Sequence, residues 1–178
     1  MVSRIRIAFS LGALSLVLFL EGCIHYSLTG VSTTATTISI EQFFNNSDLA
    51  PANLGATFTN KLKDYYLQNS SLKVLSENAD LQIEGVITEY RLNPIAPTAN
   101  QSNTNTRINA AALTRLTIAV KVNYVDGSEP KNSFKDKQFS FYQDFDNNLN
   151  FQSIQEDLEK KIFEQIMLDI FNATVANW

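Results

Sequence analysis

Residues 113–125 read LTRLTIAVKVNYV, and apolar and polar side chains alternate along this stretch. One side carries Leu116, Ile118, Val120, Val122 and Tyr124. The other side carries Arg115, Thr117, Ala119, Lys121 and Asn123. This period of two predicts a strand that faces a core on one side and water on the other. Asp126-Gly127 ends the strand in a turn.

Three more stretches are predicted as strands on either side of this one. Residues 36–44 place Ile38, Ile40 and Phe44 on one side, and Ser39, Glu41 and Phe43 on the other. Residues 81–90 place Leu81, Ile83 and Ile87 on one side, and Gln82, Glu84, Thr88 and Tyr90 on the other. Residues 134–146 direct Phe139, Phe141 and Phe145 to a buried face. The short stretch 72–75 is a candidate for one further, short strand.

Two helices complete the pattern of elements. From 52 to 68, Leu54, Phe58, Leu62 and Tyr65/Tyr66 recur at spacings of three and four, which predicts one apolar stripe. A long C-terminal helix has a broad apolar face, built on Ile154, Leu158, Ile162, Ile166 and Ile170. Ser153 and Glu156 have the spacing of a capping box at its start.

These elements predict an α+β (α/β) two-layer sandwich, with both helices packed on one face of a four-stranded mixed sheet. Each helix has one stripe to bury and each strand one apolar side, so a helical layer against a sheet buries both. The first strand–helix–strand unit pairs parallel by a crossover, and the later strands pair through hairpins. The other face of the sheet remains polar and is left uncovered by the chain's own helices.

The first residues carry the features of an exported lipoprotein. Arg4 and Arg6 precede an uncharged apolar run that ends at Gly22-Cys23, a pattern typical of a secretory signal peptide. A small residue directly before cysteine resembles a bacterial lipobox, although Glu21 departs from it. We therefore predict a signal peptide over 1–22, a lipidated N-terminus and linker over 23–37 with the lipid on Cys23, and a single domain over 38–178. The alternative is an ordinary signal peptide that leaves a free thiol, which would be unusual in an exported protein.

The composition argues against most catalytic sites. The chain has one cysteine and one histidine, His25, which lies beside the proposed anchor. Cysteine–histidine and serine–histidine pairs, and thiolate or imidazole metal sites, therefore have no residues to build them. A glycine-rich phosphate loop is also missing from the sequence. We predict no enzymatic activity, no cofactor besides the covalent lipid, and no metal.

The net charge of −4 argues against general nucleic-acid binding, so an anionic ligand would have to meet local basic residues. Three are candidates. Arg115 and Lys121 share the polar side of the central strand, about 20 Å apart at roughly 3.3 Å per residue. Arg107 lies in the segment 93–112, which is rich in Asn, Thr and Ser and is longer than most loops. Solvated surface is the alternative role for each.

Several short blocks along the chain resemble the LptE family of outer-membrane lipopolysaccharide-assembly lipoproteins. They are Cys23 with Tyr26 and Thr29-Gly30, Phe43-Phe44-Asn45-Asn46, Thr57-Phe58-Thr59 with Leu62-Lys63-Asp64, Asp80-Leu81-Gln82-Ile83-Glu84-Gly85 with Thr88-Glu89-Tyr90, Leu113-Thr114-Arg115-Leu116-Thr117-Ile118, and Val175-Ala176-Asn177-Trp178. The resemblance spans the mature chain in order and implies two helices on a four-stranded sheet. No block is a catalytic signature.

The resemblance implies a protein that plugs and helps assemble the LptD β-barrel translocon and binds lipopolysaccharide on its way to the outer leaflet. The expected location is the periplasmic face of the outer membrane, where the lipid anchors the protein. Ile24 agrees, because it replaces the aspartate associated with inner-membrane retention. Arg107, Arg115 and Lys121, our candidates for binding lipopolysaccharide or a partner, rest on charge and placement alone. A pilotin-like assembly lipoprotein for another outer-membrane complex and a periplasmic ligand-binding module remain alternatives.

Overall fold

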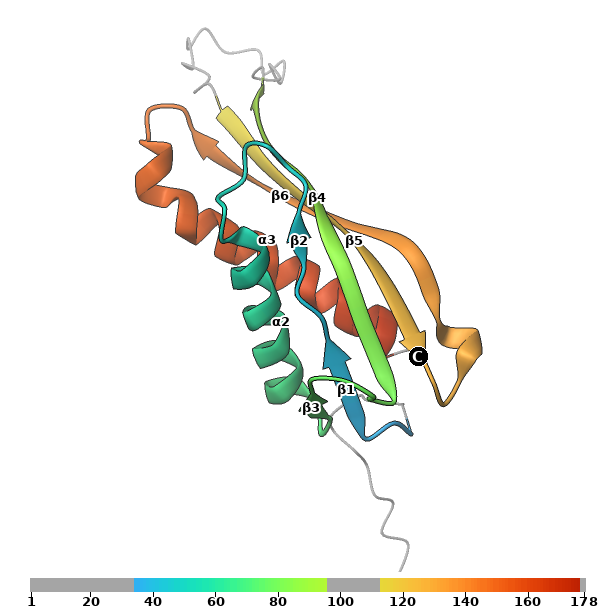
Figure 1. Ribbon diagram of the computed structural model, residues 1–178. Helices are drawn as coiled ribbons and strands as arrows, with labels where there is room; N and C mark the ends of the chain where they lie inside the picture. The colour runs from blue at the N-terminus through green and yellow to red at the C-terminus, as the bar shows by residue number, and fades with distance from the viewer. Residues whose placement is uncertain (1–33, 96–112, 177–178) are drawn as a thin grey trace, which may run out of the picture. The chain divides into compact units, whose positions relative to one another are not determined.

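The computed structural model describes residues 34–95 and 113–176, which all belong to one compact unit. Two helices pack on one face of a mixed β-sheet (Figure 1). In chain order the elements are β1 (Thr37–Ile40), β2 (Phe44–Asn45), α2 (Leu54–Asn69), β3 (Lys73–Leu75), β4 (Leu81–Ile95), β5 (Leu113–Asp126), the 3-10 helix η1 (Pro130–Asn132), β6 (Phe134–Asp146) and α3 (Phe151–Thr174). Neither α2 nor α3 combines the length and apolar character needed to cross a bilayer.

The sheet has six strands, so the predicted number of four is wrong. Its order is β3-β1-β4-β5-β6, with β2 also paired to β4. One additional strand arises because the first predicted strand divides into β1 and β2. The other is the candidate stretch 72–75, which pairs with β1 as the edge strand β3. The predicted pairing directions are confirmed: β1 lies parallel to β3 and β4, whereas β4, β5 and β6 are antiparallel.

One extra residue divides the first predicted strand. Ile40 pairs with Ile83 and Phe44 with Val86, so four steps along this strand correspond to three along β4. An extra residue reverses the side on which later side chains point. Phe43 is therefore buried at 1% exposure and Phe44 is 69% exposed, so strict alternation assigned both residues to the wrong side of the strand.

Phe43 connects the sheet to α2. Its ring lies directly over Gly85 of β4, where an added Cβ would come within 2.3 Å of the ring. Its backbone N–H donates to Thr59 Oγ1 at 2.9 Å, and its carbonyl oxygen approaches Gly55 so closely that a Cβ would lie 2.2 Å away. Both glycines are required by close approach, because any side chain there would push Phe43 out of its place.

A second irregularity corrects the predicted side of Tyr90. The β4–β5 register shifts between Ile87 and Glu89, so Thr88 is the extra residue. Tyr90 consequently points to the buried side, and its hydroxyl donates to Glu159 Oε1 of α3 at 2.8 Å. Burial and the neighbouring carboxylate both raise the pKa of this tyrosine. The strand also continues to Ile95, so Asn93–Ile95 are strand rather than the start of a loop.

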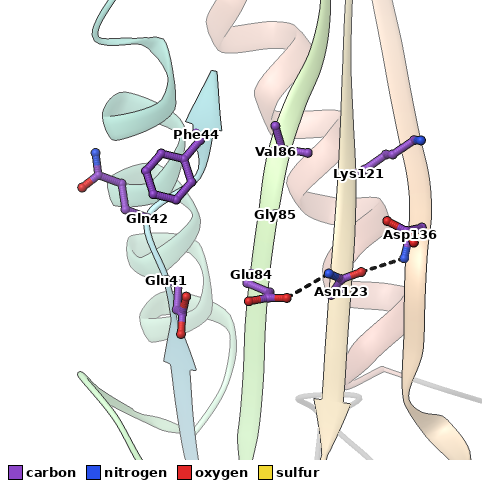
Figure 2. Close-up of a pocket in the computed structure, with 9 residues that line it drawn as sticks. All are labelled: Glu41, Gln42, Phe44, Glu84, Gly85, Val86, Lys121, Asn123 and Asp136. Atoms are coloured by element: carbon purple, nitrogen blue, oxygen red, sulfur yellow. Dashed lines mark hydrogen bonds between the residues drawn. The ribbon is translucent and has the colours of Figure 1, made fainter. Parts of the chain in front are cut away.

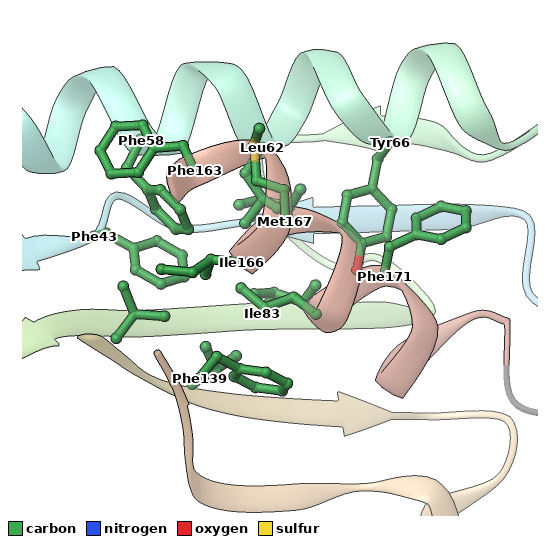
Figure 3. Packing of buried hydrophobic residues seen from close by; sticks show 14 of the residues in the cluster. Phe43, Phe58, Leu62, Tyr66, Ile83, Phe139, Phe163, Ile166, Met167 and Phe171 are labelled. Atoms are coloured by element: carbon green, nitrogen blue, oxygen red, sulfur yellow. The ribbon is translucent and has the colours of Figure 1, made fainter. Parts of the chain in front are cut away.

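The core lies between the sheet and the helices (Figure 3). Phe43, Phe58 and Phe163 form two successive edge-to-face contacts, with ring centroids 4.9 and 5.0 Å apart. Such pairs contribute about 0.5–1.5 kcal/mol each beyond the area they bury. The predicted stripes of α2 and α3 are confirmed, since Leu54, Phe58, Leu62 and Tyr66 are buried together with Leu158, Ile162, Ile166 and Ile170.

The start of α3 differs from the predicted capping box. Asn150 is the N-cap, and its side-chain oxygen accepts a hydrogen bond from the Gln152 N–H at 3.0 Å. Ser153 lies inside the helix, where its hydroxyl donates to the Asn150 carbonyl at 2.7 Å. Asparagine caps helices as well as serine does. With this earlier start, Phe151 lies in the first turn and its ring packs against Phe145 of β6.

Three buried hydroxyl-bearing residues join α2, α3 and β5. The Tyr66 hydroxyl lies 2.6 Å from Thr174 Oγ1, which donates to the Ile170 carbonyl at 2.9 Å. The Tyr124 hydroxyl donates to the Thr174 carbonyl at 3.3 Å. Burial raises the pKa of both tyrosines, so they remain neutral donors.

This arrangement predicts that Thr174→Val destabilises the protein more than Tyr66→Phe does. The valine leaves a buried tyrosine hydroxyl without its partner, at a cost of about 1–3 kcal/mol. The phenylalanine leaves Thr174 bonded to the Ile170 carbonyl, so about 1 kcal/mol is lost. Urea unfolding followed by circular dichroism measures both values. Equal losses, or the reverse order, would contradict this account of the network.

Asp80 holds the start of β1 in place through hydrogen bonds. Its Oδ2 accepts hydrogen bonds from the N–H and the hydroxyl of both Thr36 and Thr37, at 2.9–3.1 Å. Its N–H donates to Thr37 Oγ1, and its carbonyl accepts from the Gly127 N–H. The start of β1, the start of β4 and the turn after β5 are thus tied together. These donors hold the pKa of Asp80 below its ordinary value of 3.8.

We therefore expect the contribution of Asp80 to depend on pH. With its folded-state pKa depressed, the stabilisation is complete above pH 3.8 and is lost as the pH falls through the folded-state value. Asp80→Asn should reduce the unfolding free energy at neutral pH, and its difference from wild type should shrink below pH 3.8. Urea unfolding at a series of pH values tests this. A difference that does not change with pH would show that the charge plays no part.

Candidate functional site

The face of the sheet opposite the helices carries the candidate residues that the structure describes. Side chains on β4, β5 and β6 pair there in cross-strand rows. The rows are Asn93–Arg115–Asp144, Arg91–Thr117–Tyr142, Glu89–Ala119–Ser140, Val86–Lys121–Gln138 and Glu84–Asn123. Both signs of charge are interspersed among them. We call this surface the outward face.

Arg115 and Lys121 lie on this face, as predicted, but their surroundings differ. The Arg115 guanidinium donates from Nε to Asp144 Oδ1 at 2.7 Å and from a terminal nitrogen to Oδ2 at 2.9 Å. The same group stacks 3.5 Å from the centroid of the Tyr142 ring. This pairing holds the pKa of Asp144 below its usual range and raises the pKa of Arg115. Arg115 is thereby held in one position by a carboxylate and a ring.

Lys121 has no such partner. Among the described residues it forms no salt bridge, and its amine extends toward β6 (Figure 2). Of the two strand candidates, it is the cation that is available to another molecule. The other two candidates, Arg107 and Cys23, lie outside the described residues.

Lys121 also lines a shallow hollow of about 210 Å³ in the outward face. The hollow lies where the chain leaves β1 and pairs again as β2. Its walls are Glu41, Gln42, Phe44, Glu84, Gly85, Val86, Lys121, Asn123 and Asp136. In Figure 2, Glu41 and Phe44 lie opposite Glu84 and Val86, with the hollow between them.

Hydrogen bonds hold one wall of the hollow in place. Asn123 Nδ2 donates to Glu84 Oε1 at 2.9 Å, and Asn123 Oδ1 accepts from the Asp136 N–H at 2.7 Å (Figure 2). Asp136 adopts a positive φ of 53°, at the point where the β5–β6 register shifts. The irregularity in β6 therefore turns the backbone N–H of Asp136 toward Asn123. The Asn123 side chain in turn orients the Glu84 carboxylate.

Sequence reasoning missed most of this hollow. Strict alternation assigned Phe44 to the core, so its exposed ring was not predicted. Glu41 and Glu84 were expected to face solvent, but nothing in the sequence indicated that they approach each other. The only available signal was the adjacent pair of phenylalanines, which cannot both be buried in a strand with one apolar side.

The described residues are short of the side-chain types that most often build catalytic and metal sites. They contain no histidine or cysteine, because the chain's single copy of each lies outside the described part. They also contain no cluster of three or more carboxylate, histidine or cysteine side chains placed to hold a metal ion. What the outward face presents is carboxylates, amides and the Lys121 amine, beside the exposed rings of Phe44 and Tyr142.

Comparisons with known proteins give one family and a shared fold. A family model described as "LptE: Lipopolysaccharide-assembly" matches residues 35–174. A search of curated sequences found no match. Among solved structures, the hypothetical protein CT253 of Chlamydia trachomatis has a TM-score of 0.50 at 12% identity, covering 80% of this chain and 99% of that one. This likeness supports the fold alone.

Two lipoproteins are also similar in structure. A minor lipoprotein of Acinetobacter baumannii has a TM-score of 0.45 at 13% identity, covering 78% of this chain and 91% of that one. Uncharacterized lipoprotein B of Nitrosomonas europaea has a TM-score of 0.46 at 12% identity, covering 76% and 79%. The family model, in contrast, covers nearly every described residue from β1 to α3. The chain therefore belongs to the LptE family of lipopolysaccharide-assembly proteins.

Proposed function

We propose that the protein is a lipid-anchored subunit that plugs and helps assemble an LptD-type β-barrel translocon, and that it binds lipopolysaccharide during delivery to the outer leaflet. The observation that carries this proposal is the family match over residues 35–174. The family has a non-enzymatic role in lipopolysaccharide assembly. The proposed location is the periplasmic face of the outer membrane, with the lipid on Cys23.

The outward face supports a role inside a barrel. The interior of an outer-membrane barrel is polar, so a plug must present polar side chains to the wall. Helices cover only one face of the sheet (Figure 1), and the rows of charged and amide side chains lie on its other face. A lipid tether raises the concentration of the plug at the membrane that holds the barrel.

Lys121 is the first of our candidate residues for contact with a partner or with lipopolysaccharide. Its amine forms no salt bridge within the described residues, whereas Arg115 is already held by Asp144 and Tyr142. An unpaired amine is suited to meet a phosphate or carboxylate from another molecule. Arg115 remains a proposed contact, because an arginine that is stacked and paired still has further N–H donors. Arg107 also remains a proposed contact on the basis of its positive charge.

Affinity purification from membranes solubilised in mild detergent tests the proposal. We expect the full-length protein to recover a large outer-membrane barrel, and mass spectrometry of the eluate to identify it as LptD-type. Lys121→Glu should reduce recovery of the barrel or of lipopolysaccharide at least about threefold, since it reverses a charge at the contact. Its stability should change by no more than about 0.5 kcal/mol.

Lys160→Glu provides the matched control, because Lys160 is exposed on α3 in the helical layer. It makes the same charge reversal and should leave recovery unchanged. Recovery of a different secretion complex would favour a pilotin-like role instead. A small apolar ligand retained in native mass spectrometry, with no barrel, would favour a ligand-binding module.

The anchor has its own test. Cys23→Ala removes the thiol that would carry the lipid, so the protein should move from the membrane fraction to the soluble periplasmic fraction. Because the domain contributes no spanning helix among its described residues, the acyl chains are the proposed attachment. Fractionation and immunoblotting measure the distribution. A variant that remains as firmly membrane-bound as wild type would contradict lipidation at Cys23.

A further inference from the structure

The hollow beside β2 brings three acidic residues, Glu41, Glu84 and Asp136, together with an exposed ring. The extra residue between β1 and β2 turns Phe44 toward the outward face, where it lines the hollow with Glu41 and with Glu84 of β4. Irregularities of this kind often redirect side chains at functional positions. The hollow is thus a consequence of the same backbone feature that buries Phe43.

The carboxylates of the hollow have no cation paired with them. Within the described residues, none of Glu41, Glu84 and Asp136 forms a salt bridge. Glu84 uses one oxygen, Oε1, to accept from Asn123, and this bond fixes the direction of its carboxylate. Lys121 lines the rim, yet its amine points toward β6 and away from Phe44 (Figure 2). The hollow therefore presents negative charge that its own lysine does not neutralise.

The Phe44 ring adds an aromatic surface. This side chain is 69% exposed, although phenylalanine normally buries most of its area. The face of an aromatic ring carries partial negative charge and attracts cations, and guanidinium groups stack on it well. A ring beside carboxylates is therefore complementary to an arginine side chain in both charge and shape.

The same face already contains a filled example of this arrangement. Arg115 lies 3.5 Å above the Tyr142 ring while it forms two hydrogen bonds with Asp144. There the chain supplies the ring, the carboxylate and the cation from its own strands. Around Phe44 it supplies a ring and two carboxylates, but the cation is not provided by the described residues.

We propose that the hollow receives an arginine side chain from the protein partner that covers the outward face. The guanidinium stacks on Phe44 and donates hydrogen bonds to Glu84 and Glu41, and the stem of the side chain contacts Val86. The inference rests on the proposed function, because it takes the barrel as that partner. It adds the position of the contact and the chemistry of the group that enters it.

Photo-crosslinking in cells tests the contact directly. The full-length protein carries p-benzoylphenylalanine in place of Phe44, and a matched control carries it in place of Leu67, which is 54% exposed on α2 in the helical layer. We expect position 44 to crosslink to a barrel segment that contains an arginine, identified by mass spectrometry, and position 67 not to reach that segment. A crosslink from position 44 to lipopolysaccharide alone, to a barrel segment without arginine, or to nothing would overturn the inference.

A double variant removes both the ring and the charge. Phe44→Leu keeps the apolar contact and removes the aromatic face, and Glu84→Gln removes the charge while still accepting from Asn123. Together they should reduce barrel recovery in high-salt detergent washes at least about fivefold. Glu77→Gln, an exposed charge in the turn between β3 and β4, is the control and should have no effect.

The outcomes distinguish this inference from the proposed function. If wild type recovers the barrel and the double variant recovers it equally well, the arginine contact is wrong and the proposed function stands. If position 44 crosslinks to an arginine-containing segment of another protein, the contact stands and the barrel partner is wrong. If wild type recovers no barrel and position 44 captures no protein, both are wrong.

Discussion

The packing of Phe43 against Gly85 and Gly55 is the contact on which the rest of this domain depends. The ring rests on β4, and the backbone of the same residue lies against α2, so one side chain sets the distance between the two layers. To reach that position the chain needs one residue more than β4 provides. The same step turns Phe44 outward and opens the hollow, so the core and the outward face are not independent.

Residue periodicity predicted the elements well where the backbone is regular. β5 follows its alternation almost without deviation, because it is paired on both sides and its alternate residues from Leu116 to Tyr124 all lie in the core. Alternation failed at Phe44 and Tyr90, where a single extra residue changes the side on which side chains point. A strand with such a residue has the same composition as one without it, so local sequence cannot locate the change.

The site was less predictable than the fold because its contacts join residues far apart in the chain. Arg115 and Lys121 were placed correctly on one face of a strand, which requires only local spacing. Their different roles depend on the register of β6, which places Asp144 and Tyr142 beside Arg115 and leaves Lys121 opposite Gln138. Register is set by turn geometry and by long-range packing, so the pairing of Arg115 has no signature within its own strand.

In the proposed role, the outward face would select its partner by the positions of single charges, although the protein as a whole is negatively charged. Its rows interleave acids and bases, so the long-range field over this surface is weak and gives little attraction at a distance. Selectivity must then come from individual contacts made at close range, where a misplaced like charge is costly. Arg115 is satisfied within the chain, whereas Lys121 and Glu84 are neighbours of opposite sign without ion-pair partners among the described residues. In the proposed complex, the covering surface would supply an anion opposite Lys121 and a cation opposite Glu84, and this order of charges would set its position on the sheet.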